Sequence, residues 1–257
     1  MTEYTDDLNN VVTLLCRREI QNFAHAMVAK DSKAGQATAV LCSAGLDSAV
    51  LLAVESAAGI GTVRPIYISV GFAWEAAESA MLDQLVASPS FAAVDAVAKL
   101  RVDMHDVYTS SHWAVRGEPP AYDTPDADVC LVGRNAVLLA KAAVYCAHQG
   151  LSRIVLGTLA GNPFPDATPE FFDTMGRALS LGLAHEIVIE APLATSRKSD
   201  VIRLGVELGV PLGLSLSCMR PEENRHCGLC SKCRERRNAF AEAGVSDPAK
   251  YAATSPR

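Results

Sequence analysis

The sequence predicts an α/β fold in which a parallel five-stranded sheet with flanking helices is followed by a small C-terminal metal-binding segment. Three observations lead to this prediction. Short apolar runs alternate with stretches of helical periodicity between residues 39 and 208, the pattern of right-handed βαβ units. A turn of small residues joins the first apolar run to its helix. Four cysteines gather between Cys218 and Cys233, a spacing typical of metal sites.

The elements are expected in alternating order along the chain. Strands are predicted at residues 39–42, 63–70, 98–104, 153–158 and 185–190. Helices are predicted from residue 47 or 48 to residue 58, at 74–86, 136–148, 201–208 and 234–244, and after the loop at 159–172. Gly59 and Gly150 follow two of these helices, where glycine commonly ends a helix. Because ligands of parallel sheets bind beyond the carboxyl ends of the strands, the functional site is expected at that edge.

The chain divides into three predicted parts. Residues 1–36 read as an N-terminal helical extension, residues 37–213 as the main α/β domain, and residues 214–257 as a four-cysteine metal-binding segment with a helix. The segment at 106–129 is rich in Pro, Asp and Ser and shows little periodicity. Since long irregular loops in compact domains are usually functional, we expect it to act as a lid.

Composition limits the function. The 257 residues carry a net charge of −6, which argues against bulk nucleic-acid binding because that requires a basic face. No apolar run reaches membrane-spanning length and no leader pattern opens the chain, so we expect no membrane partner and a cytoplasmic location. The sequence leaves the oligomeric state open, with a homodimer among the alternatives.

The first candidate site is the turn after the first strand. Backbone N–H groups and the positive end of a helix converge there, an arrangement that binds phosphate. Ser43 and Ser48 add hydroxyl donors, and Asp47 can hold a divalent cation. No lysine lies in the turn, which excludes the common phosphate loop ending in Gly-Lys-Ser/Thr. The alternative is a plain turn in which Asp47 or Ser48 caps the helix. The residues of this candidate phosphate-binding site are Leu41, Cys42, Ser43, Ala44, Gly45, Leu46, Asp47, Ser48 and Ala49.

Two cationic side chains are candidates for neutralising phosphate. Arg134 precedes a strong helical stretch, and its planar fork suits phosphate or carboxylate. Lys198 is expected in the first turn of a helix, where a cation opposes the helix dipole, and this unfavourable placement indicates a functional role. The alternatives are that Arg134 is a surface charge and that its neighbour Asn135 simply caps the helix.

The loop at 159–172 offers two carboxylates, Asp166 and Glu170. Paired N–H groups at the edge of a purine-like or guanidine-like ligand are natural donors to such oxygens. The alternative is that Thr168 and Pro169 only begin the next helix.

The second strong signal is the cysteine set Cys218, Cys227, Cys230 and Cys233. Their polar flanks are difficult to reconcile with core packing, and four thiolates satisfy a closed tetrahedral zinc site. An iron–sulfur cluster is the alternative, because two successive Cys-x2-Cys steps also occur in cluster-binding runs. A zinc site filled by four protein ligands has no open position for catalysis, so the zinc would be structural.

Together these motifs resemble the 7-cyano-7-deazaguanine synthase family of the PP-loop ATP pyrophosphatase superfamily. The resemblance spans about residues 38–251 and rests on segments in the family's order. They are Ser-Ala-Gly-Leu-Asp-Ser at 43–48, Gly-Arg-Asn at 133–135, Pro-Asp at 165–166, Pro-Glu-Phe at 169–171, Pro-Leu at 192–193 with Lys198, Ser-Cys at 217–218, and His-Cys-Gly-Leu-Cys-Ser-Lys-Cys at 226–233.

The resemblance implies an ATP-dependent C–N ligase of queuosine biosynthesis. Such a ligase adenylates 7-carboxy-7-deazaguanine, lets ammonia displace AMP to give the amide, and activates the amide with a second ATP to form the nitrile. It implies Asp47, Lys198 and Arg134 as catalytic residues, with Mg²⁺ on Asp47. It also implies Asn135, Asp166 and Glu170 as substrate-binding residues and Zn²⁺ on the four cysteines.

The chain departs from the family pattern at several positions. Ala44 replaces the loop's first glycine, Ser-Val-Gly-Phe at 69–72 replaces an Asp-Tyr-Gly-Gln stretch, and Ala-Thr at 167–168 replaces Cys-Arg. These changes leave alternatives open. The chain could act on a related deazapurine carboxylate or a different amine, transfer sulfur on tRNA as another adenylating PP-loop enzyme, or bind ATP without catalysis.

Overall fold

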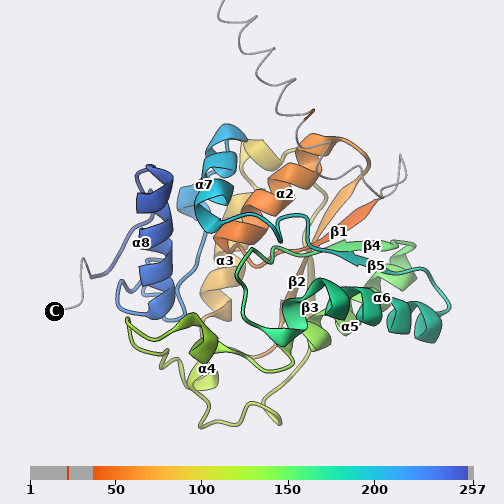
Figure 1. The fold of residues 1–257 in the computed structure, drawn as a ribbon, viewed down its shortest axis with the longest axis horizontal. Coiled ribbons are helices and arrows are strands. Elements are labelled where there is room, and N and C mark those ends of the chain that lie inside the picture. The colour runs from red at the N-terminus through yellow and green to blue at the C-terminus, as the bar shows by residue number, and fades with distance from the viewer. Residues whose placement is uncertain (1–21, 23–36, 254–257) are drawn as a thin grey trace, which may run out of the picture.

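The computed structural model describes residue 22 and residues 37–253, so the predicted N-terminal extension lies almost wholly outside the described residues. One sheet runs through the molecule in the strand order β3-β2-β1-β4-β5, with every neighbouring pair parallel (Figure 1). Its strands are β1 (Thr38–Leu41), β2 (Val63–Ser69), β3 (Ala98–Arg101), β4 (Arg153–Val155) and β5 (Val188–Glu190). The predicted parallel five-stranded sheet is confirmed.

Strands β3 and β4 end three residues earlier than predicted. The chain beyond them still donates hydrogen bonds to neighbouring strands, from Val102 N to Ser69 O at 2.8 Å and from Leu156 N to Glu190 O at 3.1 Å. Regular pairing then stops, because the backbone turns into the loops at the carboxyl edge.

The helices predicted between and after the strands are all present, and the structure adds a short helix at Trp113–Arg116 that the sequence did not predict. They are α2 (Leu46–Ala58), α3 (Glu75–Val86), α4 (Trp113–Arg116), α5 (Arg134–Gln149), α6 (Pro169–Leu183), α7 (Lys198–Glu207) and α8 (Ser231–Ala243). Gly59 and Gly150 close α2 and α5 in left-handed conformations, as the sequence indicated. Thr168 caps α6 by accepting a hydrogen bond from Phe171 N at 3.2 Å, with Pro169 at the first helical position.

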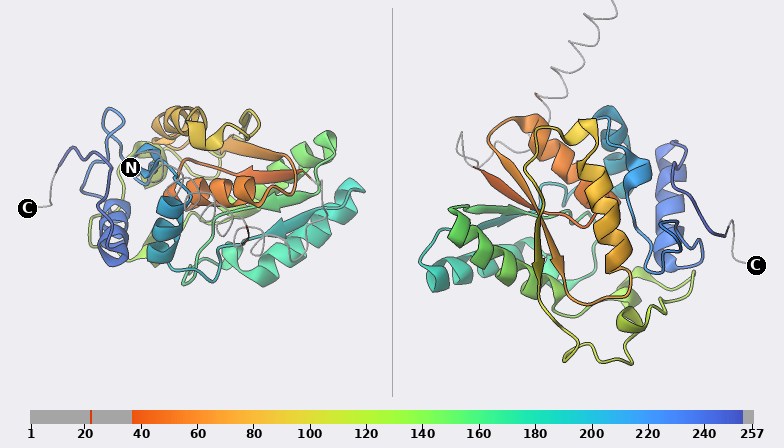
Figure 2. Two further views of the ribbon diagram at one scale, coloured as in Figure 1. Left: turned by 90° about the horizontal axis from the view of Figure 1, so that it is seen from above. Right: turned by 180° about the vertical axis from the view of Figure 1, so that it is seen from behind.

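Each face of the sheet carries its own apolar core. Helices α2, α3 and α7 pack on one face, and α5 and α6 cover the other (Figures 1 and 2). The alternation of the pleat divides neighbouring strand residues between the two cores. Val40 and Val155 belong to the first core, whereas Ala39 and Ile154 belong to the second. A sheet covered on both faces explains why the strands read as continuous apolar runs.

A buried ion pair fastens the amino-terminal edge of the sheet. Arg153 begins β4 and is 3% exposed. Its guanidinium donates to Glu55 of α2 at 2.6 and 3.1 Å and to Glu190 of β5 at 2.6 Å. It also donates to Thr38 Oγ1 at 3.0 Å. This fork joins β4 to three other elements, α2, β5 and β1.

The C-terminal segment shares the core of the α/β domain. Helix α8 packs beside α7 (Figure 1). Its residue Phe240 and the four cysteines belong to the same apolar cluster as Leu193 and Val201. The boundary at 213/214 stays a prediction. None of the helices in the described part of the chain combines the length and apolar character needed to cross a membrane.

Candidate active site and metal centre

The loop at 43–48 has an ordered polar frame. Ser48 Oγ donates to Gly45 O at 3.0 Å and accepts from Ser43 N at 3.3 Å. Gly45 is the N-cap residue of α2, so the alternative in which Asp47 or Ser48 caps the helix is wrong. The helix simply begins earlier than predicted, at Leu46. The Asp47 side chain is thereby released from a capping role.

Ala44 adopts the left-handed backbone conformation, with φ +56°. The preference of this position for glycine therefore has a conformational cause, since an L side chain is strained there by about 1–2 kcal/mol. The methyl group is fully buried, and Ala44 O accepts from Leu216 N at 2.9 Å. Packing and this hydrogen bond hold the loop in shape despite the strain.

A cavity of about 450 Å³ opens at the carboxyl edge of the sheet. The predicted site residues that line it are Leu41, Cys42, Ser43, Gly45, Leu46, Asp47, Ser48, Arg134, Asn135, Asp166, Lys198 and Cys218. The tertiary structure thus brings together residues from the β1–α2 loop, α5, the 159–172 loop and α7, as predicted for a parallel sheet. Ala44 and Ala49 are buried behind this surface.

An ionic cluster occupies the side of the cavity next to α2. Lys198 Nζ lies 3.2 Å from Asp47 Oδ2 and 2.5 Å from Glu235 Oε1. Lys232 Nζ lies 2.6 Å from Glu235 Oε2. Burial opposes ionisation of Glu235, but the charges of Lys198 and Lys232 outweigh it and lower its pKa to about 2. Burial likewise opposes the charge of Lys198, yet Asp47 and Glu235 raise its pKa, so the ammonium group is retained.

Asp47 has the features of a cation ligand. Its Oδ1 is buried and has no hydrogen-bond partner within the described residues. Burial raises the pKa of the carboxyl group, and the nearby Lys198 only partly offsets this. A buried orphan oxygen is costly unless a ligand satisfies it. Carboxylate oxygen is the donor that Mg²⁺ prefers, so this residue fits the predicted magnesium role.

Arg134 and Asn135 lie at the start of α5. The N-cap residue is Gly133, so the interpretation of Asn135 as the cap is wrong. Instead Asn135 N donates to Asp166 Oδ2 at 3.0 Å, and its side-chain amide donates to Asp166 O at 3.1 Å. Asp166 therefore satisfies a free N–H at the helix end and fixes the 159–172 loop to α5. Both Arg134 and Asn135 line the cavity.

Glu170 does not join the other predicted residues. It is exposed in the first turn of α6 and does not line the cavity. An acidic residue in the first turn interacts favourably with the helix dipole. This accounts for Glu170 without a ligand.

Glu78 of α3 lines the cavity and was missed by sequence reasoning. Its Oε2 accepts from Tyr67 Oη at 3.2 Å. Burial raises its pKa to about 8, although the charge of Arg134 acts in the opposite direction. Glu78 is therefore largely protonated at neutral pH and adds little negative charge to a phosphate site. The sequence of α3 contains no pattern that distinguishes Glu78 from the other polar residues of this helix.

Aromatic side chains form another wall of the cavity. Phe72, Trp74 and Trp113 line it. The rings of Trp74 and Trp113 are stacked, with centroids 5.9 Å apart and an interplanar angle of 18°. Trp113 comes from the 106–129 segment, which also contributes Asp126 and Val129. That segment contains the short helix α4 but is otherwise mostly irregular, and its role as a lid stays a prediction.

The two histidines near the cavity have structural contacts. His112 accepts from Ala114 N at 3.2 Å and so caps α4. His105 packs against Gly71, where an added Cβ would come within 2.3 Å of the ring. Neither lines the cavity. Hydrogen bonding and packing therefore account for both histidines.

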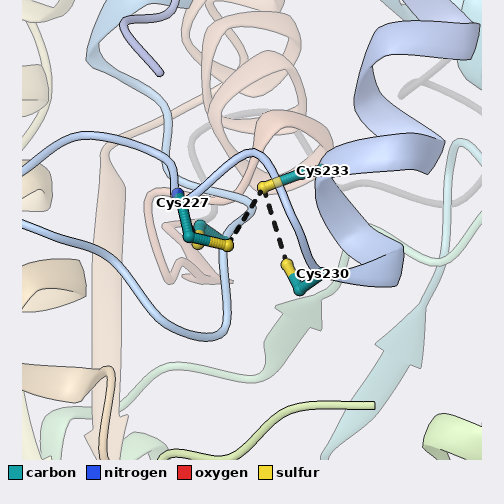
Figure 3. A group of neighbouring side chains, drawn as sticks. Cys227, Cys230 and Cys233 are labelled. Carbon is teal, nitrogen blue, oxygen red and sulfur yellow. Dashed lines mark hydrogen bonds between the residues drawn. The ribbon is translucent and has the colours of Figure 1, made fainter. Parts of the chain in front are cut away.

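The cysteine set forms a compact buried centre. The sulfur atoms of Cys218, Cys227, Cys230 and Cys233 all lie within 4.8 Å of one another. Figure 3 shows those of Cys227, Cys230 and Cys233 pointing toward one another. The arrangement fits one tetrahedral metal ion with four protein ligands.

Backbone groups and a neutral histidine support this centre. Cys218 Sγ accepts from Cys227 N at 3.2 Å and from Arg220 N at 3.3 Å. Burial lowers the pKa of His226 to about 4. The neutral ring accepts a hydrogen bond from Ser217 N at 3.1 Å, which aligns the residue before the first cysteine.

Comparison with known proteins adds to this geometry. The family described as "Queuosine biosynthesis protein QueC" matches residues 37–244. A 7-cyano-7-deazaguanine synthase of Methanothrix thermoacetophila is 33% identical over 221 residues, covering 82% of this chain and 96% of that protein. The chain belongs to the QueC family. A 7-cyano-7-deazaguanine synthase of Anaeromyxobacter dehalogenans is also 33% identical, over 236 residues that span 88% of this chain and all of the relative.

Membership confirms the predicted resemblance, the queuosine-pathway assignment and the ligase class of enzyme. A solved structure supports the fold alone. The U34-tRNA thiolase NcsA from Methanococcus maripaludis, titled with its [4Fe-4S] cluster, superposes with a TM-score of 0.51 at 12% identity, covering 89% of this chain and 75% of the thiolase.

Sulfur transfer finds no support at the loop. Cys42, the one cysteine adjacent to it, is buried, and burial raises its pKa to about 11. Such a thiol is a poor nucleophile at neutral pH.

Proposed function

We propose that this protein is an ATP-dependent ligase that converts 7-carboxy-7-deazaguanine, or a closely related deazapurine carboxylate, first to the amide and then to the nitrile. The proposal is supported above all by one observation. The small-residue loop, the orphan oxygen of Asp47 and the cations Lys198 and Arg134 converge on a single cavity at the carboxyl edge of the sheet.

The first half of the reaction forms an acyl adenylate. A carboxylate oxygen of the substrate attacks the α-phosphorus of ATP, and pyrophosphate leaves. Backbone N–H groups of the 43–48 loop, together with the hydroxyls of Ser43 and Ser48, would hold the leaving phosphates. Asp47 would hold Mg²⁺, which supplies positive charge to the pyrophosphate. Lys198 and Arg134 would place further positive charge beside the phosphates, where negative charge develops.

Ammonia then attacks the acyl carbon, and AMP leaves as the amide forms. In the second half the amide oxygen attacks the α-phosphorus of another ATP, and pyrophosphate leaves again. Loss of the nitrogen-bound protons and of AMP gives the nitrile. Two ATP therefore yield two AMP and two pyrophosphate for each product molecule.

The chain's own groups would orient the deazapurine. The amide nitrogen of Asn135 donates to the 159–172 loop, which would leave its amide oxygen to accept from an N–H edge. Asp166 fixes that loop and would present its remaining lone pairs to the same edge. The aromatic wall would stack against the planar ring. Glu170 lies outside the cavity, so we assign it no contact with substrate.

The four cysteines would hold one Zn²⁺ with a structural role. They are all buried, and their sulfur atoms converge on one point. Four protein ligands leave no position at which the metal could bind substrate.

The test follows AMP and product mass together. Zinc-replete protein is incubated with ATP, Mg²⁺, ammonium and 7-carboxy-7-deazaguanine. We expect AMP to accumulate at two per nitrile formed. Parallel reactions contain 7-deazaguanine without the carboxylate, which should give no AMP. ATP binding without AMP formation from the carboxylate would refute the proposed substrate.

A further inference from the structure

Two charged side chains of the metal-binding segment lie in the nucleotide cavity. Lys232 and Glu235 are on α8, and both line the cavity together with Ser43, Asp47 and Lys198. Their side chains are 27% and 22% exposed. Sequence reasoning counted Lys232 only as a polar flank of the cysteines.

The two lysines of the cavity share one carboxylate. Glu235 Oε1 contacts Lys198 Nζ at 2.5 Å, and Glu235 Oε2 contacts Lys232 Nζ at 2.6 Å. A carboxylate that bridges two ammonium groups holds both close to one point. Lys198 also contacts Asp47 at 3.2 Å. The ammonium group of Lys232 is therefore placed close to Asp47, the proposed magnesium ligand, although the two residues are far apart in the sequence.

We propose that Lys232 is a phosphate-binding residue of this site, supplied by the metal-binding segment. The inference rests on the proposed function in taking pyrophosphate, the leaving group of adenylation, as the anion. Asp47 and Glu235 neutralise Lys198 and Lys232 in pairs, so the cluster has no net charge before an anion and its magnesium enter.

Donor capacity separates the two lysines. An ammonium group has three N–H donors. Lys198 directs two of them to carboxylates, at Asp47 and Glu235. Within the described residues Lys232 makes one such bond, to Glu235, and its next carboxylate oxygen, on Asp126, is 3.9 Å away. Lys232 therefore has the greater remaining capacity to donate to phosphate oxygens.

The metal centre fixes the position of Lys232. Its neighbours in the sequence include two ligands, Cys230 and Cys233. Cys230 is the N-cap residue of α8, and Cys233 N donates to Cys230 O at 3.0 Å. A metal bound by these thiolates would hold the first turn of α8 rigid, and with it the base of the Lys232 side chain. A closed metal site without open positions can in this way contribute to nucleotide binding.

A simple i,i+3 ion pair is the competing explanation. Exposed pairs of this kind contribute little to binding or stability. In that case removing the Lys232 ammonium would leave anion affinity unchanged.

The test measures binding of magnesium pyrophosphate by calorimetry to zinc-replete protein. Lys232→Met should raise the dissociation constant by about 10- to 100-fold, since a hydrogen bond to a charged group is lost. Lys232→Arg keeps the charge and should stay within about threefold of wild type. The matched control is Lys99→Met, because Lys99 forms an exposed pair with Asp83 at 2.7 Å, away from the cavity. It should bind as wild type does.

The results separate this inference from the proposed function. Pyrophosphate binding needs no deazapurine, so a wrong substrate assignment leaves the measurement valid. Lys232→Met binding within threefold of wild type, with AMP still formed from the carboxylate, overturns the inference alone. The inference is also overturned if Lys232→Arg weakens pyrophosphate binding as much as Lys232→Met does and both variants lose zinc. The weaker binding would then result from damage to the metal centre. Wild-type protein that binds no pyrophosphate overturns it as well.

Discussion

Replacement of Asp47 by asparagine should separate catalysis from stability. The substitution keeps the size of the side chain and removes one negative charge from the cavity. At 3.2 Å from Lys198 Nζ, that charge has a gross attraction of about 5 kcal/mol at an effective dielectric constant of about 20. A divalent cation on Oδ1 would experience a comparable or larger attraction. Removal of one strong electrostatic contact to the transition state typically lowers kcat by about 10²–10³-fold. We expect Asp47→Asn to lower kcat by the same factor.

Asp47→Asn should leave the stability of the folded protein unchanged or increase it. Burial raises the pKa of Asp47 in the folded protein. The carboxyl group therefore stabilises the folded protein fully at pH values below the pKa that it has in the unfolded chain. This contribution is lost as the pH rises through the higher pKa that it has in the folded protein. Asparagine cannot ionise, so at pH 8 the variant should melt at the same temperature as wild type or higher.

The assay measures AMP formation under saturating ATP over a series of Mg²⁺ concentrations, with melting temperature measured on the same samples. The control is Asp83→Asn, since Asp83 is exposed and pairs with Lys99. It should change neither quantity. Turnover of Asp47→Asn within threefold of wild type would refute the assigned role. A markedly lower melting temperature would show instead that Asp47 is structural.

Three other predictions concern the framework, the protonation of the cavity and the metal. Arg153→Met should lower the free energy of unfolding by about 3–5 kcal/mol, because it leaves the Glu55 charge buried without its partner; a loss below about 1 kcal/mol in urea titrations would contradict this. Glu78, with a folded pKa of about 8 against an ordinary value of 4.5, stabilises the fold fully below pH 4.5 and loses this contribution as the pH rises through 8. Wild-type melting temperature should therefore fall more steeply between pH 5 and pH 8 than that of Glu78→Gln, and parallel curves over this range would exclude an elevated pKa. Elemental analysis should find one zinc per chain, and removal of the metal by a chelator should lower the melting temperature; iron with visible absorbance would identify a cluster instead.

The order of secondary structure was largely predictable from the sequence. Strands buried on both faces must be apolar along their length, and helices must carry periodic apolar stripes, so both leave direct marks on the chain. The cysteine centre was equally visible, because four cysteines at short spacing match the ligand pattern of a structural zinc site. The loop at 43–48 was visible since its chemistry depends on consecutive small residues and backbone groups.

The charged half of the site depended on tertiary structure. Glu78 and Glu235 lie on helices with many polar residues, and only packing decides which of these face the cavity. Glu170 carried the same kind of sequence signal as Asp166, yet the first turn of α6 places it in solvent. Asn135 resembled a helix cap until Gly133 proved to occupy that position.

By itself, then, the sequence determined the parallel sheet, the turn of small residues at 43–48 and the clustering of the four cysteines, because each is encoded by neighbouring residues or a regular period. Only the tertiary structure decided that α8 packs beside α7 and brings Lys232 and Glu235 to Lys198 and Asp47. The contacts of Lys198 join residues 37 and 151 positions apart. Contacts between residues so far apart leave no periodic pattern in the sequence, because any charged surface residue of α7 or α8 could equally have faced the cavity. Their geometry follows from the packing of the whole chain.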